Sequence, residues 1–169
     1  MAILETRNLS KTYGRGDAAV CALRGTDLEL KEGQFTAIVG PSGGGKSTLL
    51  HLLGGLDDPT TGAVYVDGQD LYALPEGERA AFRRRNFGFI FQAFHLMPVL
   101  TAEENIIMPV LLDGAQPDPV HVNGLHSLLG LSERLNHLPG QLSGGQQQRV
   151  AIARADRTLE IIDGVVREG

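Results

Sequence analysis

A glycine-rich stretch of the chain has the composition and spacing of a phosphate-binding loop. Residues 40–47, the phosphate loop, match the pattern G-x-x-x-x-G-K-[ST] and lie between a short apolar segment, residues 35–39, and a stretch of helical composition, residues 47–56. Glycines let the backbone wrap closely around phosphates, and N–H groups at the start of the following helix attract anions. The lysine supplies positive charge to the β- and γ-phosphates, and the next hydroxyl can ligate Mg²⁺. The alternative is a glycine-rich turn that binds no ligand. The predicted phosphate-binding residues are Gly40, Ser42, Gly43, Gly44, Gly45, Lys46, Ser47 and Thr48.

A second anion-binding pattern occurs about a hundred residues later. Ser143 can cap the helix that is expected to follow it, while Gly144 and Gly145 leave the first N–H groups of that helix bare. Gln146 completes the pattern. One chain with two phosphate sites suggests that two copies pair, whereas the alternative is a helix cap without a ligand.

Together, the phosphate loop and the Leu-Ser-Gly-Gly-Gln sequence at residues 142–146, the signature segment, resemble the ATPases of the ABC type over essentially the whole chain. Residues 9–23, 87–96 and 140–149 are most similar to the macrolide-export and lipoprotein-release type. The resemblance implies that the chain binds and hydrolyses ATP with Mg²⁺. It also implies a head-to-tail homodimer, or a pair with another ATPase subunit, in which the signature segment of one copy closes over the ATP held by the other copy. The implied partner is an integral membrane permease, and the implied location is cytoplasmic, peripheral at the inner face of the plasma membrane.

The resemblance assigns roles to two further residues. Tyr13 lies in the turn-rich stretch where the family places an aromatic ring that stacks on adenine; otherwise it is a core or surface tyrosine. Gln92 matches the family's glutamine that reaches Mg²⁺ and the attacking water, so it is the candidate catalytic residue and, with Ser47, a candidate metal ligand. Otherwise Gln92 is an ordinary amide at the end of a strand.

Residues 93–98 resemble the surface that receives a helix of the permease. Phe94, Leu96 and Met97 would otherwise form an unexplained exposed apolar cluster.

The expected fold is α/β, a P-loop NTPase core with an N-terminal antiparallel β-subdomain and an α-helical subdomain. Residues 2–30 indicate antiparallel strands, and residues 63–66 lead into a hairpin turn at Asp67 and Gly68. Thr101 and Glu104 form a predicted capping box. Short strands are predicted at residues 35–39 and 87–91, and helices, besides the one after the phosphate loop, at residues 76–85, 102–112, 120–129 and 132–136.

These elements are expected to form one domain over residues 1–169. It would comprise a nucleotide-binding core and antiparallel sheet (1–92), a helical subdomain with the signature segment (93–155) and a C-terminal hairpin (156–169).

Composition excludes several other classes of protein. The single Cys21 allows no internal disulfide, and the net charge of -5 argues against a nucleic-acid binder, which needs clustered Lys and Arg. The start of the chain has no signal pattern, and the most apolar run, residues 106–112, is short and contains Pro109.

The carboxylates that such ATPases need are missing. The family has a buried strand that ends in an Asp, which helps to hold Mg²⁺, followed by a Glu that polarises the attacking water. No Asp-Glu pair occurs in this chain, and the two strings that imitate the strand, residues 63–67 and 159–163, both run into Gly and indicate hairpins. None of the histidines has the position of the family's switch histidine; they are His51, His95, His121, His126 and His137.

We therefore expect an internal gap at 155/156, visible as a Cα separation clearly wider than about 3.8 Å. Such a gap would leave residues 35–39 without sheet neighbours and expose their apolar surface. If the chain is continuous there, the expectation becomes a nucleotide-binding module that does not hydrolyse. A third reading is a soluble ABC-type ATPase that acts on nucleic acid or ribosomes, which the acidic charge and the permease-like surface after Gln92 disfavour.

Overall fold

The computed structural model describes residues 2–91 and 93–161, and of residues 156–161 the backbone only. The chain divides into two compact units, Met1–Arg83 and Arg84–Ile161, so the boundary lies before the expected position at residue 92. In the described part of the chain, no helix has the length and apolar character needed to cross a membrane.

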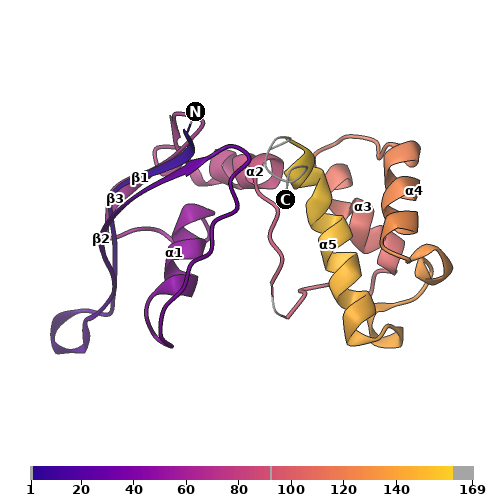
Figure 1. The fold of residues 1–169 in the computed structure, drawn as a ribbon, viewed down its shortest axis with the longest axis horizontal. Helices are drawn as coiled ribbons and strands as arrows, with labels where there is room; N and C mark the ends of the chain where they lie inside the picture. The colour runs from indigo at the N-terminus through magenta and orange to yellow at the C-terminus, as the bar shows by residue number, and fades with distance from the viewer. Residues whose placement is uncertain (1, 92, 162–169) are drawn as a thin grey trace. The chain divides into compact units, whose positions relative to one another are not determined.

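An antiparallel sheet dominates the first unit (Figure 1). Its strands are β1 (Ala2–Tyr13), β2 (Val20–Lys31), β3 (Thr61–Val66) and β4 (Gln69–Asp70), in the order β2-β1-β3-β4; a 3-10 turn, η1 (Gly16–Ala18), joins the first two. Asp67 and Gly68 have φ values of 48° and 80°, and two consecutive positive φ angles suit the tight turn of a hairpin. The antiparallel strands and the hairpin predicted at residues 63–68 are thus confirmed.

Two helices accompany this sheet. Helix α1 (Lys46–Leu53) lies alongside it (Figure 1) and buries one apolar side, formed by Leu49, Leu52 and Leu53. The sheet contributes Leu4, Leu9, Val64 and Val66 to the buried core. Helix α2 (Glu76–Asn86) has Glu76 and Glu78 in its first turn, which confirms the helix predicted at residues 76–85. Most of its residues are half-buried, and none is fully buried.

Two predicted strands are not formed. Residues 35–39 and 87–91 have no regular secondary structure, so these two predictions are wrong. Phe35 is 91% exposed and Val39 is 86% exposed, because no strand in the described residues pairs with this segment. An exposed segment at residues 35–39 is what the absence of the remaining core strands was expected to produce.

Helices make up the second unit. They are α3 (Ala102–Leu112), α4 (Pro119–Leu128) and α5 (Gly144–Ile161), with two 3-10 turns, η2 (Ser132–Arg134) and η3 (Pro139–Gln141). At the start of α3 the Glu104 N–H donates to Thr101 Oγ1 at 3.2 Å, and the Thr101 N–H donates to Glu104 Oε2 at 2.7 Å, which confirms the capping box. The core of this unit packs α3 against α5 through Ala102, Ile106, Leu131, Leu142, Val150 and Ala153.

Helix α5 continues through positions 155 and 156 to Ile161. The wide Cα separation expected at 155/156 is therefore not observed, and residues 156–161 extend the helix instead of beginning a hairpin. The rest of the predicted hairpin, residues 162–169, lies outside the described residues.

His126 on α4 is a buried imidazole without a hydrogen-bond partner. It is 2% exposed, and neither ring nitrogen has a partner. Burial lowers the pKa of His126 below its usual value of 6.5, and the nearby carboxylate of Glu103 opposes this only in part. The unfolded chain consequently takes up a proton here that the folded chain excludes, so stability should decrease as the pH falls below about 6.5.

His126→Leu should raise the free energy of unfolding by about 1 kcal/mol at pH 7, because it removes the unsatisfied polar group. It should also abolish part of the loss of stability below pH 6.5. Urea unfolding at several pH values measures both effects, with His51→Gln on the exposed face of α1 as the control. A His126→Leu protein that is less stable at pH 7 would contradict this account.

Candidate functional site

The phosphate loop folds back on its own lysine. Lys46 begins α1, and its ammonium donates to the carbonyl oxygens of Gly40 at 2.9 Å and Pro41 at 2.7 Å. The Gly44 N–H donates to Pro41 O at 3.1 Å. Ser47 and Thr48 follow in the first turn of α1. The structure thus brings the predicted phosphate-binding residues together at one helix start, with the positive charge directed into the loop.

Position 45 requires a glycine, both for its backbone conformation and for the close approach of a neighbouring strand. It precedes α1 with φ 78°, in the left-handed region, and a Cβ at this position would lie 2.3 Å from the carbonyl oxygen of Ala22 on β2. The end of the phosphate loop therefore contacts the backbone of β2 directly. Ala22 lies two residues from Val20, which pairs with Tyr13 on β1, so this contact brings the loop close to Tyr13.

Tyr13 is the last residue of β1 and is 42% exposed. Its hydroxyl donates to Asp57 Oδ2 at 2.7 Å, and the Lys11 ammonium lies 4.9 Å from the ring centroid. Lys11 Nζ also donates to Asp57 Oδ1 at 2.6 Å. We call these three residues the Tyr13 cluster.

Neither Lys11 nor Asp57 was predicted from the sequence. The acidic turn after α1, which contains Asp57 and Asp58, is the only local signal, and it does not reveal a partner more than forty residues away. Burial alone would raise the pKa of the Asp57 carboxyl, but hydrogen bonds from Lys11 and Tyr13 outweigh it and hold that pKa below the usual value.

The signature segment forms the cap that the sequence predicted. The Gln146 N–H donates to Ser143 Oγ at 3.3 Å, and the Ser143 N–H donates to Gln146 Oε1 at 2.8 Å. Gly144 and Gly145 are exposed, and a Cβ on either would meet no atom within 4 Å. The start of α5 is therefore open on the side where an anion would approach its N–H groups.

Gln92 lies outside the described residues, but the segment after it is well defined. Phe94 and His95 have positive φ values of 58° and 48°. The guanidinium of Arg154 on α5 donates to their carbonyl oxygens, at 3.4 Å for Phe94 and 2.8 Å for His95. Phe94 and Leu96 are half-buried, and Leu96 packs against the helical core, so the expectation that these two side chains are exposed is wrong. Met97 is 42% exposed, as expected.

Asn105 fixes the chain that follows this segment. Its side chain is fully buried; Oδ1 accepts from the Met97 N–H at 2.8 Å, and Nδ2 donates to the carbonyl oxygens of Met97, Leu100 and Thr101 at 2.9–3.1 Å. One amide thus binds the backbone at Met97, Leu100 and Thr101 and fixes the course of the chain into α3.

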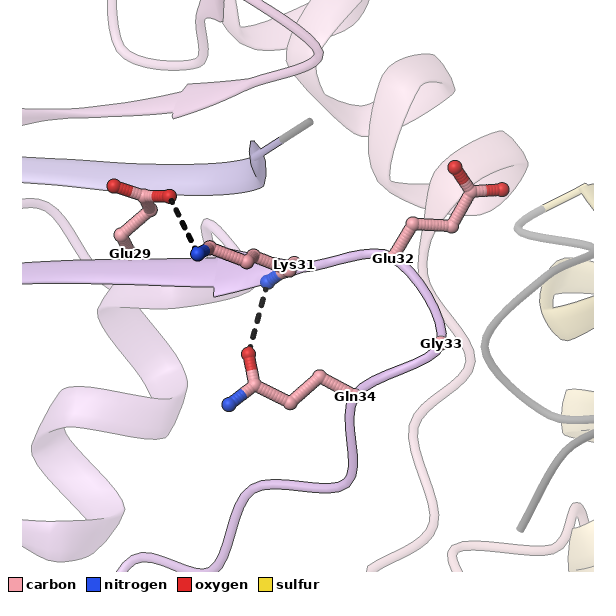
Figure 2. A pocket seen from close by; sticks show the side chains of 5 residues that line it. All are labelled: Glu29, Lys31, Glu32, Gly33 and Gln34. Carbon is pink, nitrogen blue, oxygen red and sulfur yellow. Dashed lines mark hydrogen bonds and ion pairs between the residues drawn. The ribbon is translucent and has the colours of Figure 1, made fainter.

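An open recess of about 580 Å³ lies at the end of β2 (Figure 2). It is lined by Glu29, Lys31, Glu32, Gly33 and Gln34. Lys31 already pairs with Glu29 at 3.9 Å, and its N–H donates to Gln34 Oε1 at 3.2 Å. The recess contains none of the predicted site residues, and we assign no site to it.

Among the side chains of residues 2–91 and 93–155, no group of three from His, Cys, Asp or Glu could hold a metal ion. The predicted magnesium ligand Ser47 stands instead at the phosphate loop, where phosphate oxygens would complete an oxygen ligand set of the kind that Mg²⁺ prefers.

Comparison with known proteins gives one consistent result. A family model described as ABC transporter matches residues 23–158. The lipoprotein-releasing system ATP-binding protein LolD of Xanthomonas campestris pv. campestris is 49% identical over 156 residues, which are 91% of this chain and 65% of LolD. The macrolide export ATP-binding/permease protein MacB of Marinobacter nauticus is 48% identical over 155 residues, 90% of this chain and 24% of MacB. The chain therefore spans less than two thirds of the length of either curated relative.

Among solved structures, MJ0796, described as a bacterial ABC transporter cassette, matches with a TM-score of 0.84 and 41% identity over 92% of this chain and 70% of that chain. MJ0796 is described as dimeric, also in a post-hydrolysis state bound to ADP and Pi. These similarities confirm the α/β P-loop fold class and the resemblance stated from the sequence.

Lys46→Ala should weaken the binding of Mg-ATP by roughly 1.5 to 3 kcal/mol, the usual value of a hydrogen bond to a charged group. Isothermal titration calorimetry measures the affinity, and Lys31→Ala at the end of β2 is the control with the same loss of charge. If Lys46→Ala binds Mg-ATP as tightly as the unmodified chain, the phosphate loop is not the nucleotide site.

Proposed function

Because the chain belongs to the ABC transporter family, we propose that it is the ATP-binding subunit of a membrane transporter and couples ATP binding and hydrolysis to a separate permease. The observation that supports this most directly is the phosphate loop, in which Lys46 stands at the start of α1 with its ammonium turned into the loop. That arrangement offers a positive charge, helix N–H groups and the Ser47 hydroxyl to the same phosphates.

The proposed chemistry divides among the chain's own residues. Lys46 binds the β- and γ-phosphates, and Tyr13 stacks on the base. Ser47 and Gln92 would hold Mg²⁺, which would neutralise charge on the phosphates when bound. Gln92 also orients the attacking water.

Two copies of the chain would complete each site. The phosphate loop belongs to the first unit and the signature segment to the second, and each offers helix N–H groups to an anion. We infer a head-to-tail homodimer, or a pair with a related ATPase subunit, in which Ser143 and Gln146 of one copy face the ATP bound to the other. The dimeric form described for MJ0796 supports this pairing.

The proposed contact with the permease is the surface formed by residues 93–98. Met97 is 42% exposed and Val99 beside it is 77% exposed, whereas Arg154 and Asn105 hold the backbone around them. An apolar surface with a fixed backbone suits contact with a partner protein. The chain would then act at the inner face of the plasma membrane, on its cytoplasmic side.

Hydrolysis needs carboxylates that this sequence does not contain, since no Asp-Glu pair occurs in it. Because α5 runs unbroken through positions 155 and 156, we expect the chain of 169 residues to bind nucleotide without hydrolysing it, and we infer that a hydrolysing form carries these carboxylates in an additional segment at 155/156. The greater length of LolD and the post-hydrolysis state described for MJ0796 support a hydrolysing protein.

Gly144→Asp should block ATP-dependent pairing and leave ATP binding to the single chain intact. The new side chain fits because nothing lies within 4 Å, and an acidic residue at a helix start does not disfavour folding, but it would repel the partner's phosphates. Light scattering with a non-hydrolysable ATP analogue measures pairing. The control is Gly124→Asp on α4, which also meets no atom within 4 Å. Normal pairing of Gly144→Asp would exclude a role of the signature segment across the dimer.

Sequencing the gene across codons 150 to 160 should reveal additional codons at 155/156 that encode an apolar strand ending in Asp-Glu. The chain of 169 residues should meanwhile bind ATP without measurable turnover, because phosphate positioning survives while the water-polarising carboxylate is lost. An uninterrupted gene would instead favour the module that binds nucleotide without hydrolysis. Turnover by the chain as it stands would contradict the requirement for the missing pair.

A further inference from the structure

The Tyr13 cluster holds an exposed aromatic ring in one orientation. The Asp57 carboxylate uses both oxygens: Oδ2 accepts from the Tyr13 hydroxyl at 2.7 Å, and Oδ1 accepts from Lys11 Nζ at 2.6 Å. Both are charge-assisted hydrogen bonds. The Lys11 side chain is only 12% exposed, so water competes weakly for its bond, whereas the bond from the Tyr13 hydroxyl is exposed. The ring can therefore not rotate freely about its attachment to β1.

Asp57 is itself held in place. The Tyr72 hydroxyl lies 2.7 Å from the Asp57 carbonyl oxygen and 2.6 Å from the carbonyl oxygen of Leu52, which belongs to α1. The Asp58 N–H donates to Asp57 Oδ1 at 2.8 Å. Asp57 thus connects the helix of the phosphate loop with the ring of Tyr13.

The two faces of the Tyr13 ring are not equivalent. The Lys11 ammonium lies 4.9 Å from the centroid and so occupies one face in a cation–π contact. Tyr13 as a whole residue is still 42% exposed, which leaves area for a second flat partner. Because Val20 pairs with Tyr13 and Ala22 contacts Gly45, the ring and the phosphate loop lie at the same end of β2.

We propose that Asp57 is a positioning residue for the nucleotide base: it orients the Tyr13 ring and keeps Lys11 on one face, so that the base stacks on the other. This inference rests on the proposed function, since it needs a nucleotide in the phosphate loop. Asp57 touches neither the phosphates nor the base; it acts through Tyr13 and Lys11.

The test compares a ligand with a base and one without. Asp57→Ala should weaken binding of Mg-ATP about tenfold, because a freely moving ring loses part of the stacking energy with the base. Binding of Mg-tripolyphosphate should not change, since the phosphate loop is intact. The matched control is Asp58→Ala, whose carboxylate pairs with Arg79 at 2.7 Å and not with the ring. Calorimetry gives both affinities, and thermal melting by circular dichroism shows whether each variant folds.

Tyr13→Phe provides a second route if Asp57→Ala does not fold. It removes only the hydroxyl group that donates to Asp57. Like Asp57→Ala, it should weaken the binding of Mg-ATP and leave the binding of Mg-tripolyphosphate unchanged. The double variant should bind Mg-ATP no more weakly than Asp57→Ala alone. Equal losses for both ligands, or no loss for either, would overturn the positioning role. If the unmodified chain binds neither ligand, the proposed function itself fails.

Discussion

At Ala22 and Gly45 the backbones of β2 and the phosphate loop approach so closely that no side chain fits between them, and the placement of the loop depends on this approach. On its other side the loop is preceded by residues 35–39, which pair with no strand in the described part of the chain and offer little support. The position of the loop therefore comes from β2, from the buried side of α1 and from the hydrogen bonds that Lys46 makes with the loop itself. Val20 on the same strand pairs with Tyr13. Strand β2 therefore positions both the phosphate loop and the ring proposed to stack on the base.

The second unit uses a different means of fixing irregular backbone. Asn105 and Arg154 direct donors at the carbonyl oxygens of residues 94–101, and Gln147 Nε2 does the same for Pro139 and Leu142, at 3.0 and 3.1 Å. A side chain that satisfies several backbone acceptors specifies one conformation where no helix or strand does. The surface around Met97 and the approach to the signature segment are consequently fixed by polar side chains as well as by apolar packing.

Features specified by neighbouring residues could be predicted from the sequence, and features specified by distant ones could not. The capping boxes at Thr101 and Ser143 and the turn at Asp67 each depend on a few adjacent residues. Residues 35–39 have the composition of a strand, yet a strand needs partners, and none is described for this segment. Asp57 was missed for a related reason: its role comes from Tyr13 and Lys11, which reach it only through the fold.

Residues 35–39 combine features that favour contact between chains. The sequence Phe-Thr-Ala-Ile-Val is uncharged, contains no proline and is rich in β-branched and aromatic residues. Phe35 and Val39 are almost fully accessible, and the segment's backbone groups pair with no strand among the described residues, so they form a template for cross-β stacking with the same segment of another molecule. Aggregation of the 169-residue chain should therefore begin here, beside the phosphate loop, and self-association would take up the very stretch of backbone that leads into the nucleotide site.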